Sequence, residues 1–206
     1  LCDLNAIVYD QNDLDAEEIE ARIVEYVPQF KQISSHLRHG LDKALMMLSQ
    51  CAASARKVEV LKLNGSGLTP ARLMALSEAI KPHSSTGQGF AKLRELHLND
   101  NRSLLPVAGA RISKDQPWDR LCQAIAHTAH HHQLTFVSFS GCRLHDECVA
   151  VLATHLLREE MGSKSKSKNR QRLFTLDVSN NETLSYKGGK YLADALVVRD
   201  HNWPVV

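Results

Sequence analysis

A chain of 206 residues can bury one sizeable hydrophobic core or form one short array of repeats. Its formal net charge of +2 excludes a polycation, so the overall charge points to neither nucleic acid nor an anionic membrane. The 5 cysteines are odd in number and form no CxxC pair, which favours free thiols in a reducing intracellular compartment, most simply the cytoplasm, over a disulfide framework.

The chain opens with Leu-Cys-Asp, which contains no initiator Met and no signal-peptide pattern. We interpret this start as that of a fragment or a processed product, from which an organelle-targeting signal can be missing. No apolar run is long enough to span a bilayer, so we expect no membrane partner.

Residues 1–57 carry a weak repeat pattern. In L-N-A-I-V-Y-D-Q-N-D-L, from Leu4 to Leu14, apolar or aromatic residues stand at positions 1, 4 and 6 and an Asn at position 9. The stretch V-P-Q-F-K-Q-I-S-S-H-L, residues 27–37, shows the same spacing but places Gln32 at position 6. The alternative for this region is an inserted helix, whose apolar stripe would contain Leu37, Leu41, Leu45 and Leu48.

From residue 58 onward the same spacing recurs in segments that start at residues 58, 93, 134 and 173. Apolar residues fill positions 1, 4 and 6, position 9 is Ser, Asn or Cys, and a leucine follows. The segments are V-E-V-L-K-L-N-G-S-G-L, L-R-E-L-H-L-N-D-N-R-S-L, L-T-F-V-S-F-S-G-C-R-L and L-F-T-L-D-V-S-N-N-E-T-L. In the second and fourth segments the last leucine, Leu104 or Leu184, comes one residue late.

This spacing is typical of a short parallel strand followed by a turn. Positions 4 and 6 point to the same side of a strand and are predicted to be buried. The polar side chain at position 9 can bond backbone groups of the turn that would otherwise stay unpaired. Asn101 and Asn181 begin formal glycosylation sequons, but we predict that they are partly buried position-9 residues. Because each unit exposes its apolar face until a neighbour stacks on it, the units must come in series.

Apolar residues at helical spacing follow three of these segments, and they predict amphipathic helices that pack on the strands. They are Leu73, Leu76 and Ile80 in the first helix, Cys148, Val151, Leu152 and Leu156 in the second, and Gly188, Leu192 and Leu196 in the third.

The segment L-D-V-S-N-N-E-T-L-S-Y-K-G-G-K-Y-L-A-D-A-L resembles the ribonuclease-inhibitor-like subtype of the leucine-rich repeat family. The resemblance covers residues 58–198 well and residues 1–57 poorly. It implies an α/β solenoid, in which a curved parallel sheet is lined by helices on its convex side and a Gly or small residue opens each helix. It also implies that the concave strand face binds other macromolecules.

The repeats are longer than is usual in this family. Their starting positions, 58, 93, 134 and 173, lie 35, 41 and 39 residues apart, against roughly 20–29 in most leucine-rich repeats. The extra residues form polar stretches near residues 82–89, 111–118 and 162–172, which we interpret as long surface insertions. We therefore divide the chain into a degenerate N-terminal region, residues 1–57, and a repeat array, residues 58–206.

The C-terminal residues H-N-W-P-V-V are apolar, whereas the last unit of a solenoid needs a polar outer face. We therefore predict that Trp203, Val205 and Val206 pack on a following element or on a partner, and that the chain is a segment of a larger solenoid.

No catalytic constellation is apparent, so we predict that the protein is not an enzyme and needs no cofactor. His127, His130 and His131 share one helix face, with His132 beyond, and zinc accepts such spacing. No Cys or carboxylate accompanies them, so an exposed turn from helix to strand is the better interpretation, and we predict no metal. Cys142 fills a position 9, and no His or Asp is placed to activate its thiol.

A basic run offers the only nucleic-acid candidate. It contains Lys164, Lys166, Lys168, Arg170 and Arg172, and such residues can contact phosphates. They alternate with Ser and Asn and have no aromatic partners, which is more typical of a solvated linker. Nucleic acid is therefore a possible but unfavoured partner.

The candidate binding residues occupy the strand positions that point away from the core. They are Lys62, Arg94, Glu95, His97, Phe136, Ser138, Phe174 and Asp177. Phe136 and Phe174 are outward aromatics on neighbouring strands, and exposed aromatics in a polar field are typical of interface hot spots. In the alternative, an insertion such as the loop near Trp118 covers them.

The sequence therefore predicts a non-catalytic protein–protein interaction scaffold, a subunit or segment of a multi-subunit assembly that binds through its concave strand face. Two other functions stay open. Some members of the resembled family regulate GTPases or actin, although no distinctive residues for these roles occur here. An RNA-assembly protein that uses residues 163–172 is the third.

Overall fold

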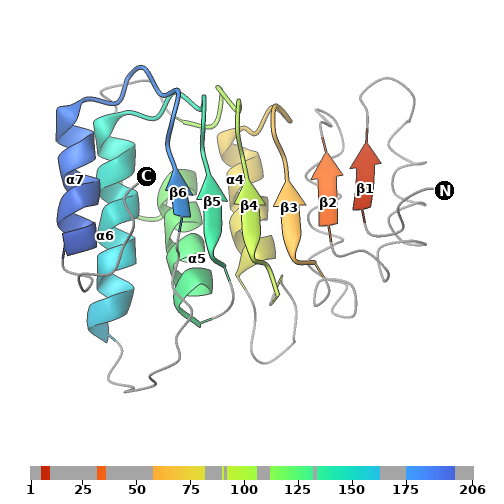
Figure 1. Ribbon diagram of the computed structural model, residues 1–206, viewed down its shortest axis with the longest axis horizontal. Coiled ribbons are helices and arrows are strands. Elements are labelled where there is room, and N and C mark those ends of the chain that lie inside the picture. The colour runs from red at the N-terminus through yellow and green to blue at the C-terminus, as the bar shows by residue number, and fades with distance from the viewer. Residues whose placement is uncertain are drawn as a thin grey trace.

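The computed structural model describes the strands Ala6–Tyr9 and Gln32–Ser35 and residues 58–81, 90, 92–105, 112–131, 134–162 and 175–197. Within these residues six strands form one parallel sheet, in which each strand neighbours the next along the chain (Figure 1). The strands are β1 (Ala6–Tyr9), β2 (Gln32–Ser35), β3 (Val60–Lys62), β4 (Glu95–His97), β5 (Phe136–Ser138) and β6 (Thr175–Asp177). The predicted α/β fold with a parallel sheet is confirmed.

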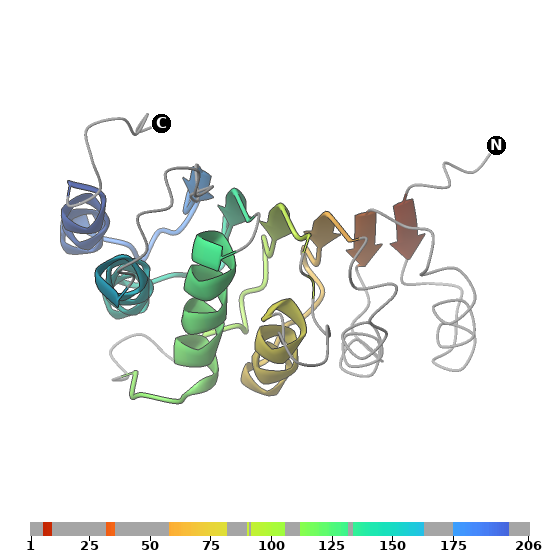
Figure 2. The same cartoon turned by 90° about the horizontal axis from the view of Figure 1, so that it is seen from below.

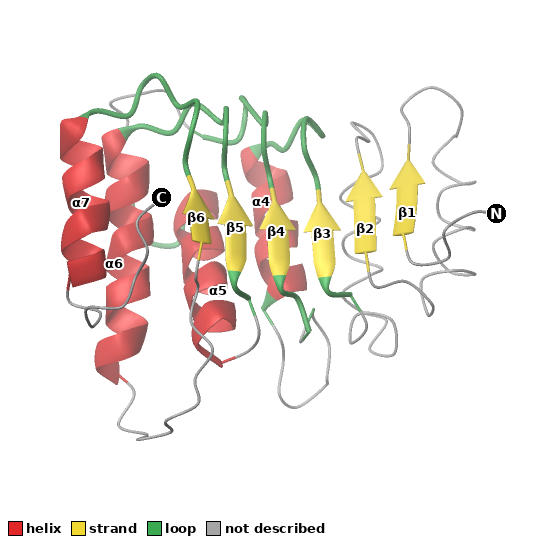
Figure 3. Ribbon diagram, in the orientation of Figure 1, coloured by secondary structure: helices red, strands yellow, loops and turns green. Residues whose placement is uncertain are grey.

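A helix follows each of the last four strands, so the unit strand–helix repeats from β3 to the end of the described chain (Figure 3). The helices are α4 (Pro70–Ile80), α5 (Pro117–His131), α6 (Asp146–Gly162) and α7 (Tyr186–Val197). Figure 2 shows that they all lie on the same side of the sheet, and consecutive helices pack together. None of the described helices is long and apolar enough to cross a membrane.

The backbone pairing aligns the repeats as their spacing predicts. Leu61 pairs with Leu96, Leu96 with Val137, and Val137 with Leu176, so position 4 of each repeat faces position 4 of the next. The same row continues through Ile33 to Ile7 on the two N-terminal strands.

The pairing corrects the spacing predicted for residues 27–37. Ile33, rather than Phe30, is in register with Leu61, and Gln32 pairs with Val60. The repeat is thus shifted by three residues along the chain. This register puts Ile33 in the row of Leu61, and apolar residues suit such a row because a buried amide would need a hydrogen-bond partner. The alternative helix with Leu37, Leu41, Leu45 and Leu48 lies outside the described residues.

The core lies between the sheet and the helices. Positions 4 and 6 of the repeats from 58, 93 and 134 are at most 1% exposed, and these residues are Leu61, Leu63, Leu96, Leu98, Val137 and Phe139. Leu176 and Val178, which were predicted to be equally buried, pack against the core but are only partly buried. The reason is their place on β6 or directly after it, because β6 is the last strand of the described sheet.

Trp118 anchors α5 to the inner side of the sheet. Its ring packs edge-on against Phe139 at a centroid distance of 5.2 Å, and its Nε1 donates to the Cys148 carbonyl at 3.0 Å. Because Phe139 points toward the helices, Trp118 lies on the opposite side of the sheet from Phe136. Trp118 itself therefore does not cover Phe136, and residues 106–111, which precede it, lie outside the described residues.

The turn after each strand requires a left-handed residue at position 8. The four residues there are Gly65, Asp100, Gly141 and Asn180, with φ of 60°, 59°, 68° and 55°. The repeats from 58 and 134 add a second left-handed residue at position 10, Gly67 or Arg143. The other two repeats insert one residue instead, and this difference explains why Leu104 and Leu184 come late in the sequence.

The position-9 side chains of the last three repeats join neighbouring repeats, as predicted, whereas the Ser66 hydroxyl donates to the Leu63 carbonyl of its own repeat at 2.7 Å. Asn181 is 8% exposed; its Oδ1 accepts from the Leu144 amide at 2.9 Å, and its Nδ2 donates to the Phe139 carbonyl at 2.9 Å. The Cys142 thiol donates to the Leu98 carbonyl at 3.0 Å, which confirms that Cys142 has a structural place in the turn.

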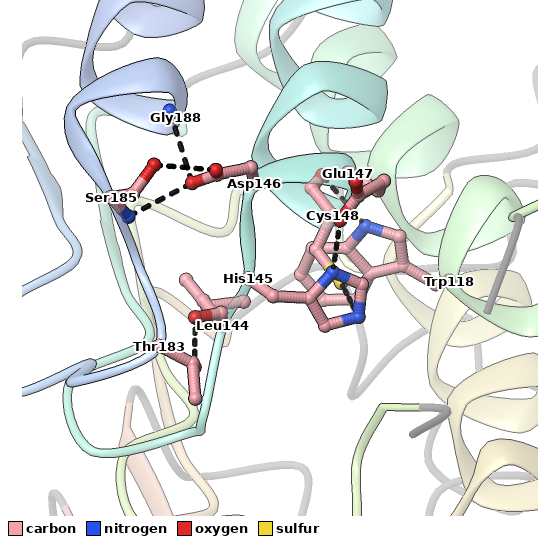
Figure 4. Close-up of polar contacts among 9 residues, drawn as sticks. All are labelled: Trp118, Leu144, His145, Asp146, Glu147, Cys148, Thr183, Ser185 and Gly188. Atoms are coloured by element: carbon pink, nitrogen blue, oxygen red, sulfur yellow. Dashed lines mark hydrogen bonds and ion pairs between the residues drawn. The ribbon is translucent and has the colours of Figure 1, made fainter. Parts of the chain in front are cut away.

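The last two repeats share a second link, which is built around Asp146 at the start of α6 (Figure 4). Asp146 Oδ1 accepts from the backbone amides of Ser185 at 2.9 Å and Gly188 at 3.0 Å, and its Oδ2 accepts from the Ser185 hydroxyl at 2.6 Å. These amides begin α7 and lack partners within that helix, so a carboxylate from the preceding repeat caps its N-terminus.

Candidate protein-binding face

The side of the sheet opposite the helices, here called the helix-free face, presents three rows of side chains that cross β3 to β6. The register forms the first row from Val60, Glu95, Phe136 and Thr175 and the second from Lys62, His97, Ser138 and Asp177. The third row, just beyond the strands, contains Asn64, Asn99, Ser140 and Ser179. These positions face outward because the alternate positions 4 and 6 are occupied by core residues.

Hydrogen bonds tie the members of the third row together. Asn64 Oδ1 accepts from the Asn99 amide at 2.9 Å, and Asn99 Oδ1 accepts from the Ser140 amide at 3.0 Å. The Ser179 hydroxyl donates to Ser140 Oγ at 3.0 Å. The face is therefore crossed by a polar ladder from β3 to β6, which holds its side chains in defined positions.

Ser138 belongs to this ladder as a buried connector. Its hydroxyl donates to Asp177 Oδ2 at 2.8 Å and also lies against Asn99 Oδ1. Ser138 is only 1% exposed, because its larger neighbours cover it. This placement corrects the expectation that Ser138 contacts a partner directly, since a small side chain between larger ones is shielded from solvent.

Phe136 and His97 form the aromatic part of the face. Their rings lie with centroids 4.7 Å apart and an interplanar angle of 34°. His97 Nε2 contacts Glu95 Oε2 at 3.1 Å, and the Glu95 side chain is 45% exposed while that of His97 is 17% exposed. The imidazole is thus held between a carboxylate and a phenyl ring.

The charges on the face are unevenly distributed. Arg94 lies 3.8 Å from Glu59, so these two charges offset each other. Partial burial raises the pKa of Asp177, but hydrogen bonds from Ser179 and Ser138 outweigh it and hold that pKa below its ordinary value. Asp177 is therefore an ionised carboxylate near neutral pH, and with Glu95 it makes the area around Phe136 acidic.

Six of the eight predicted contact residues are partly or fully accessible on this face: Lys62, Arg94, Glu95, His97, Phe136 and Asp177. Phe174 precedes β6 and lies outside the described residues, and the direct strand partner of Phe136 is Thr175. The predicted aromatic pair therefore stays a prediction. The ladder was not predicted, although the small polar residue at position 7 of every repeat is a visible signal for it.

A second cluster has the composition of an activated thiol (Figure 4). Cys148 Sγ lies 3.1 Å from His145 Nε2, and His145 Nδ1 lies 2.9 Å from Glu147 Oε2. Cys148 is completely buried, and burial raises the pKa of its thiol to about 12. A protonated thiol without access to solvent is a poor nucleophile, so we interpret the cluster as a structural hydrogen-bond chain at the start of α6.

The remaining candidates fall largely outside the described part of the chain. This is so for the basic run from Lys164 to Arg172 and for the side chains of residues 130–132. Among the described residues, no group of three or more His, Cys, Asp or Glu side chains is arranged to hold a metal ion.

The parallel sheet and the repeated strand–helix units are those of a leucine-rich-repeat-like α/β fold. The fold is similar to a solved structure of the tropomodulin C-terminal domain from Caenorhabditis elegans, with a TM-score of 0.52 and 15% sequence identity. The similarity covers 89% of this chain and 92% of that one, and at this identity it concerns the fold alone. No protein-family model and no curated protein matches the sequence.

Proposed function

We propose that this chain is a non-catalytic, protein-binding segment of a leucine-rich-repeat solenoid, and that it joins a larger assembly through its helix-free face. The observation that carries the proposal is the polar ladder beside Phe136, which includes Ser138, two residues further along β5. Side chains that are already fixed lose little conformational entropy when a partner binds, so the face is suited to specific recognition.

The distribution of covered and open surfaces supports the same function. The inner side of the sheet is filled by Leu, Val and Phe side chains under the helices, whereas the helix-free face carries a partly exposed aromatic ring among charged groups. A phenyl ring with a polar rim is the usual composition of an interface hot spot.

The test compares two aromatic residues on opposite sides of the protein. Affinity purification with cross-linking from the native source first identifies the partner. Phe136→Ala should then weaken the complex by roughly 2 kcal/mol or more, and combination with Phe174→Ala should weaken it further. The matched control is Tyr186→Ala, since Tyr186 is 89% exposed at the start of α7.

Both single variants should keep the urea midpoint of the parent, because each removes a side chain that contributes little to the core. Loss of the complex in Tyr186→Ala, with Phe136→Ala unaffected, would place the interface on the helix side and refute the proposal.

A second candidate is regulation of actin, or of a GTPase, roles that some leucine-rich repeat proteins have. The actin role, rather than the GTPase role, is favoured by the similarity to the tropomodulin C-terminal domain, which extends over 89% of this chain. The assay adds the purified chain to polymerising actin and, separately, to GTP-loaded GTPases. A change in filament elongation or in GTP hydrolysis that depends on Phe136 would make the face regulatory, and no change in either assay would favour the scaffold.

A further inference from the structure

The chemistry of the helix-free face around Phe136 indicates what kind of partner it takes. We propose that the partner presents an arginine side chain that stacks on Phe136 and pairs with Glu95 and Asp177. This inference rests on the proposed function, because it assigns the ligand of the same face.

The first observation is the placement of two carboxylates around one ring. Phe136 pairs directly with Glu95 on β4, and Asp177 follows on β6, the strand on the other side of β5. Neighbouring strands lie about 4.8 Å apart, so Glu95 stands about one strand spacing from the ring. Asp177 pairs with Ser138, two residues further along β5, and therefore stands diagonally from the ring at a larger distance. One side chain above Phe136 can therefore reach either of them.

The second observation is that these two charges lack a permanent cationic partner. Arg94 is paired with Glu59, and no lysine or arginine of the described residues pairs with Glu95 or Asp177. Glu95 contacts His97, and Asp177 is held by the Ser138 hydroxyl and by the Ser179 amide at 3.0 Å. The carboxylates are thus oriented but not neutralised by a permanent cation.

Arginine matches this arrangement better than other groups. Its planar guanidinium stacks on an aromatic face and donates in a fork that fits a carboxylate, whereas a lysine ammonium is a compact and strongly hydrated charge. A phosphate or an acidic peptide would be repelled by both carboxylates. A purely apolar segment would remove them from water without pairing them, which is unfavourable.

The inference is tested with defined peptides, which do not require the native partner. The probes are fluorescein-labelled Gly-Ser-Leu-Arg-Leu-Ser-Gly and its analogues with citrulline, lysine or glutamate in place of arginine. Citrulline keeps the shape of arginine but removes the charge. Binding is measured by fluorescence anisotropy at low salt and by chemical-shift changes at His97 and Phe136. The arginine peptide should bind at least fivefold tighter than the citrulline peptide.

The variants locate the effect on the protein. Glu95→Gln should weaken the arginine peptide at least threefold and leave the citrulline peptide unchanged. The matched control is Asp194→Asn, which neutralises an exposed carboxylate on α7 and should have no effect. Equal binding of the arginine and citrulline peptides, tighter binding of the glutamate peptide, or an unchanged affinity in Glu95→Gln would overturn the inference.

The native complex separates this inference from the proposed function. If Phe136→Ala weakens the complex while Glu95→Gln and added salt do not, the face is the interface but its ligand is not a cation. If Phe136→Ala leaves the complex intact, the proposed function itself is wrong.

Discussion

The side chain of Asn101 completes the turn of the repeat before it, because its Oδ1 accepts from the Leu68 amide at 3.1 Å across 33 residues of chain. Its Nδ2 donates to the carbonyls of Leu63 and Leu98, each at 2.8 Å, and Asn101 is only 1% exposed. One amide thus satisfies buried backbone groups of two repeats, and this is why an Asn recurs where the strand ends.

Replacing this amide should be costly. In Asn101→Ala, the buried Leu68 amide and two carbonyls lose a partner, and each such group costs about 1–3 kcal/mol when unsatisfied. We expect a loss of roughly 2–4 kcal/mol in the free energy of unfolding, measured with urea. The control is Arg102→Ala at the exposed neighbouring residue, and an equal effect of the two would contradict this account.

Leu96 and Leu176 occupy the same repeat position but differ in burial, so their truncation should lower the free energy of unfolding by different amounts. Leu96→Ala removes a side chain that is 0% exposed, and it should cost roughly 2–5 kcal/mol. Leu176→Ala changes the same repeat position on the last strand, where the side chain is only partly buried, and should cost clearly less. Urea denaturation of both variants decides the point, and a larger loss for Leu176 would indicate that β6 is covered.

Gly188 should not tolerate a side chain. A Cβ atom there would clash with Leu184 Cδ1 and would lie 2.6 Å from Asp146 Oδ1, so Gly188→Ala must displace the carboxylate that caps α7. We expect a lower melting temperature, although alanine ordinarily favours a helix. Gly189→Ala is the matched control, because nothing lies within 4 Å of a Cβ built at Gly189 and this substitution should stabilise or be neutral.

Asp146 should make the last repeat sensitive to acid. Hydrogen bonds from Ser185 and Gly188 hold the pKa of Asp146 below its ordinary value of 3.8. A lowered pKa in the folded state means that the carboxylate contributes stability above the unfolded pKa and loses it as the pH falls through the folded value. The difference in urea midpoint between the parent and Asp146→Ala should therefore be largest near neutral pH and should shrink below pH 3.8. A difference that is independent of pH would show that the charge is unimportant.

The buried thiols should be unreactive while the protein is folded. Cys122, Cys142 and Cys148 are all 0% exposed, and burial raises the pKa of Cys142 to about 11 and that of Cys148 to about 12. In a variant with Cys2→Ser and Cys51→Ser, a thiol reagent near neutral pH should react only at the rate of unfolding. Rapid modification of Cys148 would instead show an accessible nucleophile beside His145.

Much of the fold was predictable from the sequence because its signals are local. Apolar residues at positions 4 and 6 must share one side of a strand, and this geometry correctly identified Leu61, Leu96 and Val137 as core residues. Leu104 and Leu184, which come one residue later than the corresponding leucines of the other repeats, also indicated a real difference between the turns. The sequence was misleading at Gln32, where a fit to the same spacing was three residues out of register.

The candidate site depends on contacts between residues that lie far apart in the sequence. No local sequence pattern indicates such contacts. Ser138 meets Asp177, 39 residues further on, and becomes a buried connector only because the neighbouring strand brings that carboxylate beside it. The cluster at Cys148 is local in sequence, because His145 lies only 3 residues before Cys148, but the burial that keeps its thiol protonated comes from the surrounding core.

The sequence by itself therefore determined which residues point inward, where the turns lie and which side chains share the open face. Only the tertiary structure decided which of those side chains are free to meet a partner. The reason is that burial and hydrogen bonding on the face are set by neighbours from other repeats, such as Asn99 and Asp177 around Ser138.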